Sequence, residues 1–167
     1  LGPGEPDDSK RSALTALTVD AAFADMQVVD RDMAISCVSG VWLLHNFLDA
    51  SHRLSQGIDT PTGSFWHGIM HRREPDYSNA KHWFNRVGDH ETFPQLREEA
   101  ENIIAGAGGP DALNRLLDSE RWDPFTFVDL CEQAAKDDDS LADFCRRIQQ
   151  REWEILFDYC FRQAPGG

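Results

Sequence analysis

Apolar residues recur every three to four positions along most of the chain, which is the spacing of one face of an α-helix. The stripe is clearest near the C-terminal end, in Leu141, Phe144, Cys145, Ile148, Ile155, Leu156, Tyr159 and Cys160. No segment of four or more residues alternates β-branched with polar positions, as a half-buried strand would. The pattern therefore predicts an all-α protein, built as a single helical bundle of seven or eight helices.

Capping residues, glycine and proline divide the pattern into helices. Asp30 and Thr60 are typical N-caps. Pro75 forces a tight corner between two helices, and Asp76 or Ser78 can cap the second of them. We place the second and longest helix at the centre of the bundle, because its apolar residues cover more than one side. The expected helices cover residues 13–29, 31–56, 61–74, 77–87, 93–105, 111–117 and 124–136, followed by a last helix that an acidic turn at 137–140 caps.

A chain of 167 residues is long enough for one hydrophobic core and short for two. Residues 1–12 contain proline, glycine and charged side chains with almost nothing to bury, so we expect a disordered tail there. Residues 13–165 are then one all-α domain. No internal period of 30 to 45 residues is present, which argues against a helical solenoid.

The charge balance narrows the choice of partner. With 16 basic and 29 acidic side chains, the formal net charge is −13, which opposes binding to nucleic acid or to an anionic membrane. No run of apolar residues is long enough for a membrane span. The four cysteines form no C-x-x-C pair, so we expect buried thiols in a reducing, cytoplasmic compartment and no zinc site made of cysteines alone.

All six histidines lie between residues 45 and 90, and their spacing indicates a shared face. A spacing of four and then three residues occurs on two consecutive predicted helices, in His45, Asp49 and His52 and in His67, His71 and Glu74. Residues so spaced are neighbours on one side of a helix. Glu152 interrupts the C-terminal apolar stripe, so we expect its carboxylate to face either an arginine of the central segment or a metal ion. The alternative is that the stripe rotates there and leaves Glu152 at its edge.

Imidazole and carboxylate groups on facing helices bind divalent metals such as zinc, iron or manganese. The candidate metal ligands are His45, Asp49, His52, His67, His71, Glu74 and Glu152. The match to known helical metal sites is incomplete, because the chain has neither H-E-x-x-H nor two carboxylate-x-x-His elements. The alternative is structural: each imidazole places one nitrogen on a backbone carbonyl and the other toward water.

The corner at Pro75 offers a second kind of site, for a small anionic molecule. Basic and polar side chains gather around it, and the free N–H groups of the following helix favour an anion. The candidate ligand-binding residues are Arg72, Arg73, Asp76, Asn79, His82 and Arg86. The alternative is that the arginines pair with Glu74 or Asp76 and only fix the corner.

Residues 66–88 resemble a family of uncharacterised bacterial and fungal proteins that carry the segment W-H-x-I-x-H-R-x-E-x-D-x-x-N-A-x-x-W-x-R-R-x-G. The resemblance covers about 25 of the 167 residues and implies no activity; Asn85 stands where the family pattern has an arginine. It draws attention to His67, His71, Arg72, Glu74, Asp76, Asn79 and Trp83.

The chain also lacks the motifs of serine hydrolases, P-loop NTPases and dinucleotide-binding enzymes. Our leading hypothesis is a helical domain whose polar site binds a divalent metal or a small anion, and whether it is an enzyme stays open. The alternative is a protein-interaction or scaffold module in which the same residues are purely structural.

Overall fold

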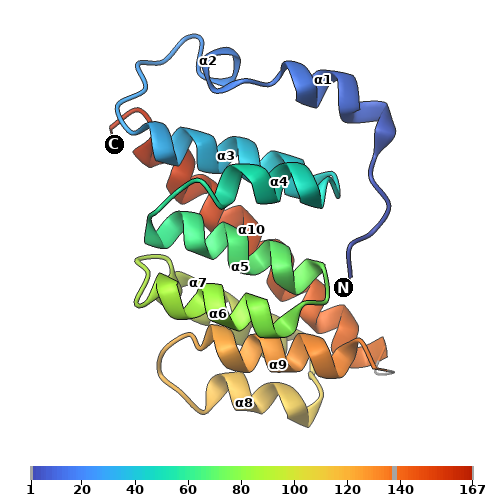
Figure 1. Ribbon diagram of the computed structural model, residues 1–167. Coiled ribbons are helices and arrows are strands. Elements are labelled where there is room, and N and C mark those ends of the chain that lie inside the picture. The colour runs from blue at the N-terminus through green and yellow to red at the C-terminus, as the bar shows by residue number, and fades with distance from the viewer. Residues whose placement is uncertain (1, 137–138, 167) are drawn as a thin grey trace.

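The computed structural model describes residues 2–136 and 139–166, and in these residues every regular element is helical (Figure 1). The predicted all-α class is confirmed. Ten α-helices occur in the described residues: α1 (Arg11–Ala16), α2 (Val19–Ala22), α3 (Arg31–Leu44), α4 (Leu48–Ser55), α5 (Pro61–Arg73), α6 (Tyr77–Val87), α7 (Phe93–Ala107), α8 (Asn114–Leu117), α9 (Pro124–Ala134) and α10 (Asp139–Gln163). Two short 3₁₀ segments, η1 (Asp8–Lys10) and η2 (Asp111–Leu113), precede α1 and α8.

The long helix α10 crosses behind the other helices and joins them into one bundle (Figure 1). It contacts α3, α7 and α9, while α4 packs on α5 and α5 on α6. Its buried side contains the predicted stripe from Leu141 to Cys160, including Glu152. The four cysteines are buried thiols, as predicted, and none of them forms a disulfide within the described residues. None of the helices in the described ranges has the length and apolar character needed to cross a bilayer.

The prediction of one long helix over residues 31–56 is wrong. α3 ends at Leu44, Asn46 adopts a left-handed φ of 63°, and α4 begins at Leu48. Asparagine tolerates this conformation better than most residues, and the Asn46 side chain also donates a 2.9 Å hydrogen bond to the Glu5 carbonyl oxygen. The break folds α4 back onto α3, where the Ser39 and Ser51 hydroxyls lie 3.0 Å apart.

The N-terminal region also differs from the predicted single helix at 13–29. α1 ends before Leu17, and Thr18 starts α2 by accepting a hydrogen bond from the Ala21 N–H. Because these two breaks divide two predicted helices, the described residues contain more helices than the seven or eight expected. The predicted tail, residues 1–12, contains η1 and the start of α1.

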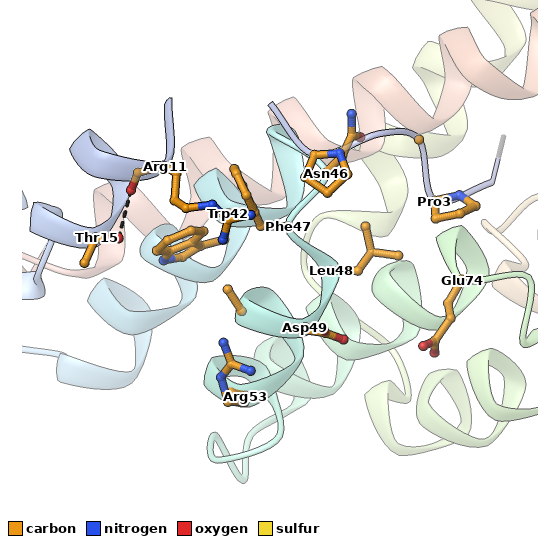
Figure 2. Close-up of a pocket in the computed structure, with 13 residues that line it drawn as sticks. Pro3, Arg11, Thr15, Trp42, Asn46, Phe47, Leu48, Asp49, Arg53 and Glu74 are labelled. Atoms are coloured by element: carbon orange, nitrogen blue, oxygen red, sulfur yellow. Dashed lines mark hydrogen bonds between the residues drawn. The ribbon is translucent and has the colours of Figure 1, made fainter. Parts of the chain in front are cut away.

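The segment before η1 runs along the corner between α3 and α4. The Arg73 side chain donates to the carbonyl oxygens of Gly2 and Pro3, at 2.9 and 3.1 Å. Pro3 and Asn46 line a cavity at this corner (Figure 2). The predicted acidic cap at 137–140 lies partly outside the described residues, and α10 begins at Asp139.

Caps predicted from the sequence set the start of three helices. The side chains of Asp30, Thr60 and Asp76 accept hydrogen bonds from the N–H groups of Met33, Gly63 and Asn79, each three residues further on. Pro61 is the first residue of α5, as expected.

Inside the bundle, Gly40 of α3 lets the Trp66 ring of α5 come close, because a Cβ at position 40 would lie 2.7 Å from that ring. α5 lies deep in the bundle, and eleven consecutive residues of it, from Thr62 to Arg72, are buried.

His90 joins α5 to the connection between α6 and α7. Its Nε2 lies 3.1 Å from the Thr62 hydroxyl and its Nδ1 lies 2.9 Å from the Thr92 hydroxyl. Burial lowers the pKa of His90 from 6.5 to about 4, against an opposing effect of Glu91. The imidazole is therefore neutral at pH 7.

Acidification is expected to destabilise the protein through His90. Between pH 6.5 and about 4, His90 is protonated in the unfolded chain but stays neutral in the folded protein. The contribution of the neutral His90 to the free energy of unfolding is therefore complete above pH 6.5 and is lost as the pH falls toward 4. The contribution is at most about 1.4 kcal/mol per pH unit. Urea unfolding of wild type and His90→Asn at several pH values measures it: the variant should show a shallower pH dependence. An equal slope for the wild type and His90→Asn would contradict the prediction.

Candidate metal centre

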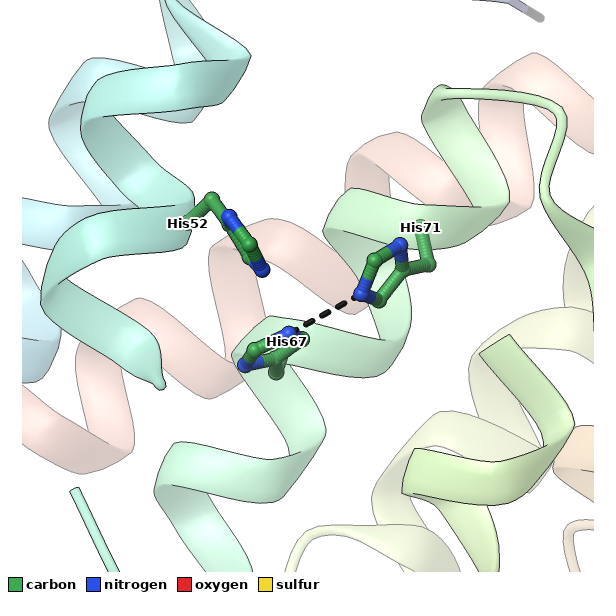
Figure 3. Close-up of side chains that lie close together, drawn as sticks. All are labelled: His52, His67 and His71. Carbon is green, nitrogen blue, oxygen red and sulfur yellow. Dashed lines mark hydrogen bonds between the residues drawn. The ribbon is translucent and has the colours of Figure 1, made fainter. Parts of the chain in front are cut away.

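Three histidines from two helices gather between α4 and α5 (Figure 3). His52 comes from α4, and His67 and His71 lie one turn apart on α5. One ring nitrogen from each lies within 4.8 Å of the others. The His52 ring meets the other two edge to face, with ring centres 4.6 Å from His67 and 5.3 Å from His71. We call these residues the histidine cluster.

Glu74 sets the orientation and the tautomer of His71. The Nδ1 atom of His71 lies 3.0 Å from a carboxylate oxygen of Glu74. A carboxylate only accepts, so Nδ1 carries the hydrogen and the lone pair of His71 is on Nε2. That lone pair faces the rest of the cluster: the Nε2 atoms of His71 and His67 are 2.9 Å apart. The amide nitrogen of Asn79, from α6, lies 3.1 Å from the same Nε2 atom.

His67 is held by a stack of side chains from α6. The Trp83 ring lies parallel to the imidazole, at 3.8 Å between centres and 17° between planes. The Arg86 guanidinium lies over the Trp83 ring, 4.9 Å from its centre. The Nδ1 atom of His67 is buried and has no hydrogen-bond partner among the described residues. Of the two ring nitrogens of His67, only Nε2 therefore lies within hydrogen-bond distance of another described residue, His71.

The two buried histidines of the cluster, His67 and His71, are uncharged at neutral pH. Burial, with the nearby His71 and His52 rings, lowers the pKa of His67 from 6.5 to about 3. Burial also lowers the pKa of His71, although Glu74 opposes this. His67 and His71 are 1% and 5% exposed, whereas His52 is only half-buried. Neutral imidazoles offer lone pairs to a metal, and the half-buried His52 marks the side open to solvent.

The structure leaves two other predicted ligands of the α4 region outside the cluster. His45 is the residue after α3, and its nearest carboxylate is that of Asp7, 3.8 Å from Nδ1. Asp49 is exposed on α4 and lines the cavity of Figure 2. The break at Asn46 explains why His45 lies outside the cluster. The four-three spacing places residues on one face only within an unbroken helix.

Glu152 faces an arginine, which was one of its two expected partners. Its carboxylate accepts hydrogen bonds from both terminal nitrogens of Arg72, and both side chains are fully buried. Burial alone would lower the pKa of Arg72, but the charge of Glu152 outweighs it and raises that pKa. Arg72 also donates to Gln149 and lies 4.5 Å from the centre of the Phe127 ring. This ion pair ties α5 to α10 and places Glu152 away from the histidines.

The residues proposed for an anion pocket point to different places. Arg72 is buried against α10, Arg73 contacts the N-terminal segment, and Arg86 pairs with Asp59 at 2.7 Å. Asp76 caps α6, and His82 is exposed. Of the six, Asn79 places its side chain within hydrogen-bond distance of the His71 ring, and the Asp76 N–H donates to the His71 carbonyl oxygen. The corner at Pro75 therefore does not gather the three arginines around one point.

The family resemblance drew attention to Trp83 but gave it no role, and sequence reasoning did not anticipate that it stacks on His67. The spacing of Trp83 and Arg86 could have indicated this role, because residues three apart on the amphipathic helix α6 share a face.

Comparison with known proteins found no match: no family model, curated protein or solved structure matches this chain.

Proposed function

We propose that this protein binds one divalent transition metal ion through His52, His67 and His71. The observation that supports this most is the approach of three imidazoles to within 4.8 Å of one another, of which the buried His67 and His71 are neutral. Uncharged, desolvated histidines are the preferred nitrogen ligands of such metals. The site would supply three ligands and leave a further position for water or a substrate, as catalytic zinc sites do.

The spacing of the nitrogens favours this proposal. Two imidazole nitrogens on a tetrahedral zinc ion stand about 3.3 Å apart, from zinc–nitrogen distances of about 2.0–2.1 Å. The Nε2 atoms of His67 and His71 are already 2.9 Å apart, so an opening of a few tenths of an ångström would admit the ion. Without a metal, the same contact requires one hydrogen between the two nitrogens.

Glu74 then acts as an orienting residue instead of the ligand that its spacing suggested. It binds the Nδ1 atom of His71, and a carboxylate on the outer nitrogen of a ligating histidine makes that ligand more basic. A second group of candidate ligands, His71, Glu74 and Asp76, contains two exposed carboxylates. Such exposed acidic groups are common without any ion, so we place the metal at the three histidines.

The ligand set narrows the choice of metal. Three imidazoles suit zinc or ferrous iron, whereas manganese prefers carboxylate and water oxygens. The four cysteines are buried elsewhere in the core and do not join the cluster in the described residues. Of the three metals expected from the sequence, zinc therefore fits best, iron second and manganese least.

A titration of the purified protein with zinc, in competition with a chromophoric chelator, tests the proposal. We expect one ion per chain, weaker binding of manganese, and no change in His45→Ala, because His45 lies outside the cluster. A wild-type protein that takes no zinc from the chelator would contradict the proposal. The cluster would then be a structural lock between α4, α5 and α6, which is the interaction-module hypothesis.

A further inference from the structure

A cavity of about 640 Å³ lies between the N-terminal segment, α1 and the corner joining α3 to α4 (Figure 2). Its size falls within the range of small-molecule sites in proteins, about 300–1,000 Å³. None of the three clustered histidines lines it, although Glu74, which binds His71, stands at one edge. The cavity is therefore distinct from the proposed metal centre.

Side chains of both charges line this cavity. They are Arg11, Arg53, Asp49 and Glu74, and Figure 2 shows that Asp49 and Arg53 both come from α4. Arg11 is already engaged, because it binds Asp8 and its guanidinium lies 4.6 Å from the centre of the Phe47 ring. Arg53 is the cation left to meet a ligand.

Asp49 and Arg53 are not paired with each other. They stand four residues apart on α4, with the acid first, which is the arrangement that favours an ion pair along a helix. Neither side chain forms an ion pair or a hydrogen bond with any described residue, and both line the cavity. Neighbouring side chains on one helix turn are about 5–6 Å apart at Cβ, a separation that suits a compact ligand bearing both charges.

Aromatic and aliphatic side chains also line the cavity. Trp42 and Phe47 meet edge to face at 5.2 Å between ring centres, and Leu48 follows at the start of α4. Trp42 and Leu48 are each only half-buried, so they present apolar surface to the cavity. Apolar walls with a few converging polar groups are typical of small-molecule sites.

We propose that this cavity binds a free α-amino acid with an aromatic side chain. Arg53 holds the carboxylate, Asp49 holds the ammonium group, and the side chain packs against Trp42. A guanidinium binds a carboxylate through paired, charge-assisted hydrogen bonds, and a carboxylate accepts from an ammonium in the same way. The net charge of the ligand is zero, so the strongly acidic surface of the protein does not repel it.

Calorimetric titration with L-phenylalanine, in buffer containing a metal chelator, tests this binding separately from the metal proposal. Wild type should bind the amino acid saturably. Phenylacetate, which lacks the ammonium, and 2-phenylethylamine, which lacks the carboxylate, should each bind about ten-fold more weakly or worse, because each leaves one charged group unpaired.

Two substitutions assign the contacts. Arg53→Gln and Asp49→Asn should each weaken phenylalanine binding by about ten-fold, and both are exposed positions where the fold tolerates change. Arg162→Gln is the matched control, since Arg162 is an exposed arginine on α10 paired with Asp158. Absence of saturable binding, equal binding of all three ligands, or equal loss in the Arg162 variant would each overturn the proposal. Zinc binding should be unchanged in all three variants.

Discussion

Replacing Glu152 by alanine is expected to lower the free energy of unfolding by about 3–5 kcal/mol. The reason is the Arg72 guanidinium, which is fully buried between α5 and α10 and takes both carboxylate oxygens of Glu152 as acceptors. Without them, a positive charge stays in the core with the Gln149 side-chain oxygen as its remaining acceptor in the described residues. Urea unfolding followed by circular dichroism measures the difference.

Two controls separate this effect from a general loss of contacts. The double variant Arg72→Met with Glu152→Leu should recover most of the stability, because it removes both charges and keeps apolar volume. Glu154→Ala removes a more exposed partner of Arg151 one turn away, and should cost less than about 1 kcal/mol. If Glu152→Ala proved as mild as Glu154→Ala, the buried pair would not be the link between α5 and α10 that we describe.

Substitution of a clustered histidine is expected to weaken zinc binding by at least about 100-fold, since loss of an outer partner alone costs about 10–100-fold. His52→Ala is the sharper variant, because His52 is half-buried and its removal disturbs the core less than removal of His67 or His71. Glu74→Gln removes the charge that orients His71 and should fall in the 10–100-fold range. The chelator competition described above measures both.

The matched control for these variants is His82→Ala, an exposed histidine on α6 near the cluster. It should bind zinc as the wild type does. Circular dichroism and the urea midpoint show whether each variant is folded, so that lost affinity is not mistaken for lost structure. Equal affinity in His52→Ala and His82→Ala would mean that zinc binds elsewhere.

The elements that could be predicted from the sequence are those set by local chemistry. Asp30, Thr60 and Asp76 cap helices because a short acceptor side chain reaches the third N–H beyond it, and this needs no tertiary information. Glu152 was recognisable from its position on an apolar stripe, and the cost of burying a charge predicted a charged partner.

The break at Asn46 could not be predicted in the same way. Apolar residues continue at helical spacing across it, and the contacts that hold it come from Arg73 and Glu5, which are distant in sequence. The consequences reach the site, because the break removes His45 from the face that carries His52. The arginines diverge for a related reason, since each follows a partner on a different element: Glu152, the N-terminal segment and Asp59.

X-ray absorption spectroscopy at the zinc edge, on protein loaded with one zinc ion per chain, tests the central claim most directly. The account predicts nitrogen or oxygen ligands alone at about 2.0–2.1 Å, with the outer-shell signal of three imidazole rings. A sulfur ligand at about 2.3 Å, or a first shell without imidazole, would place the ion away from His52, His67 and His71 and contradict it.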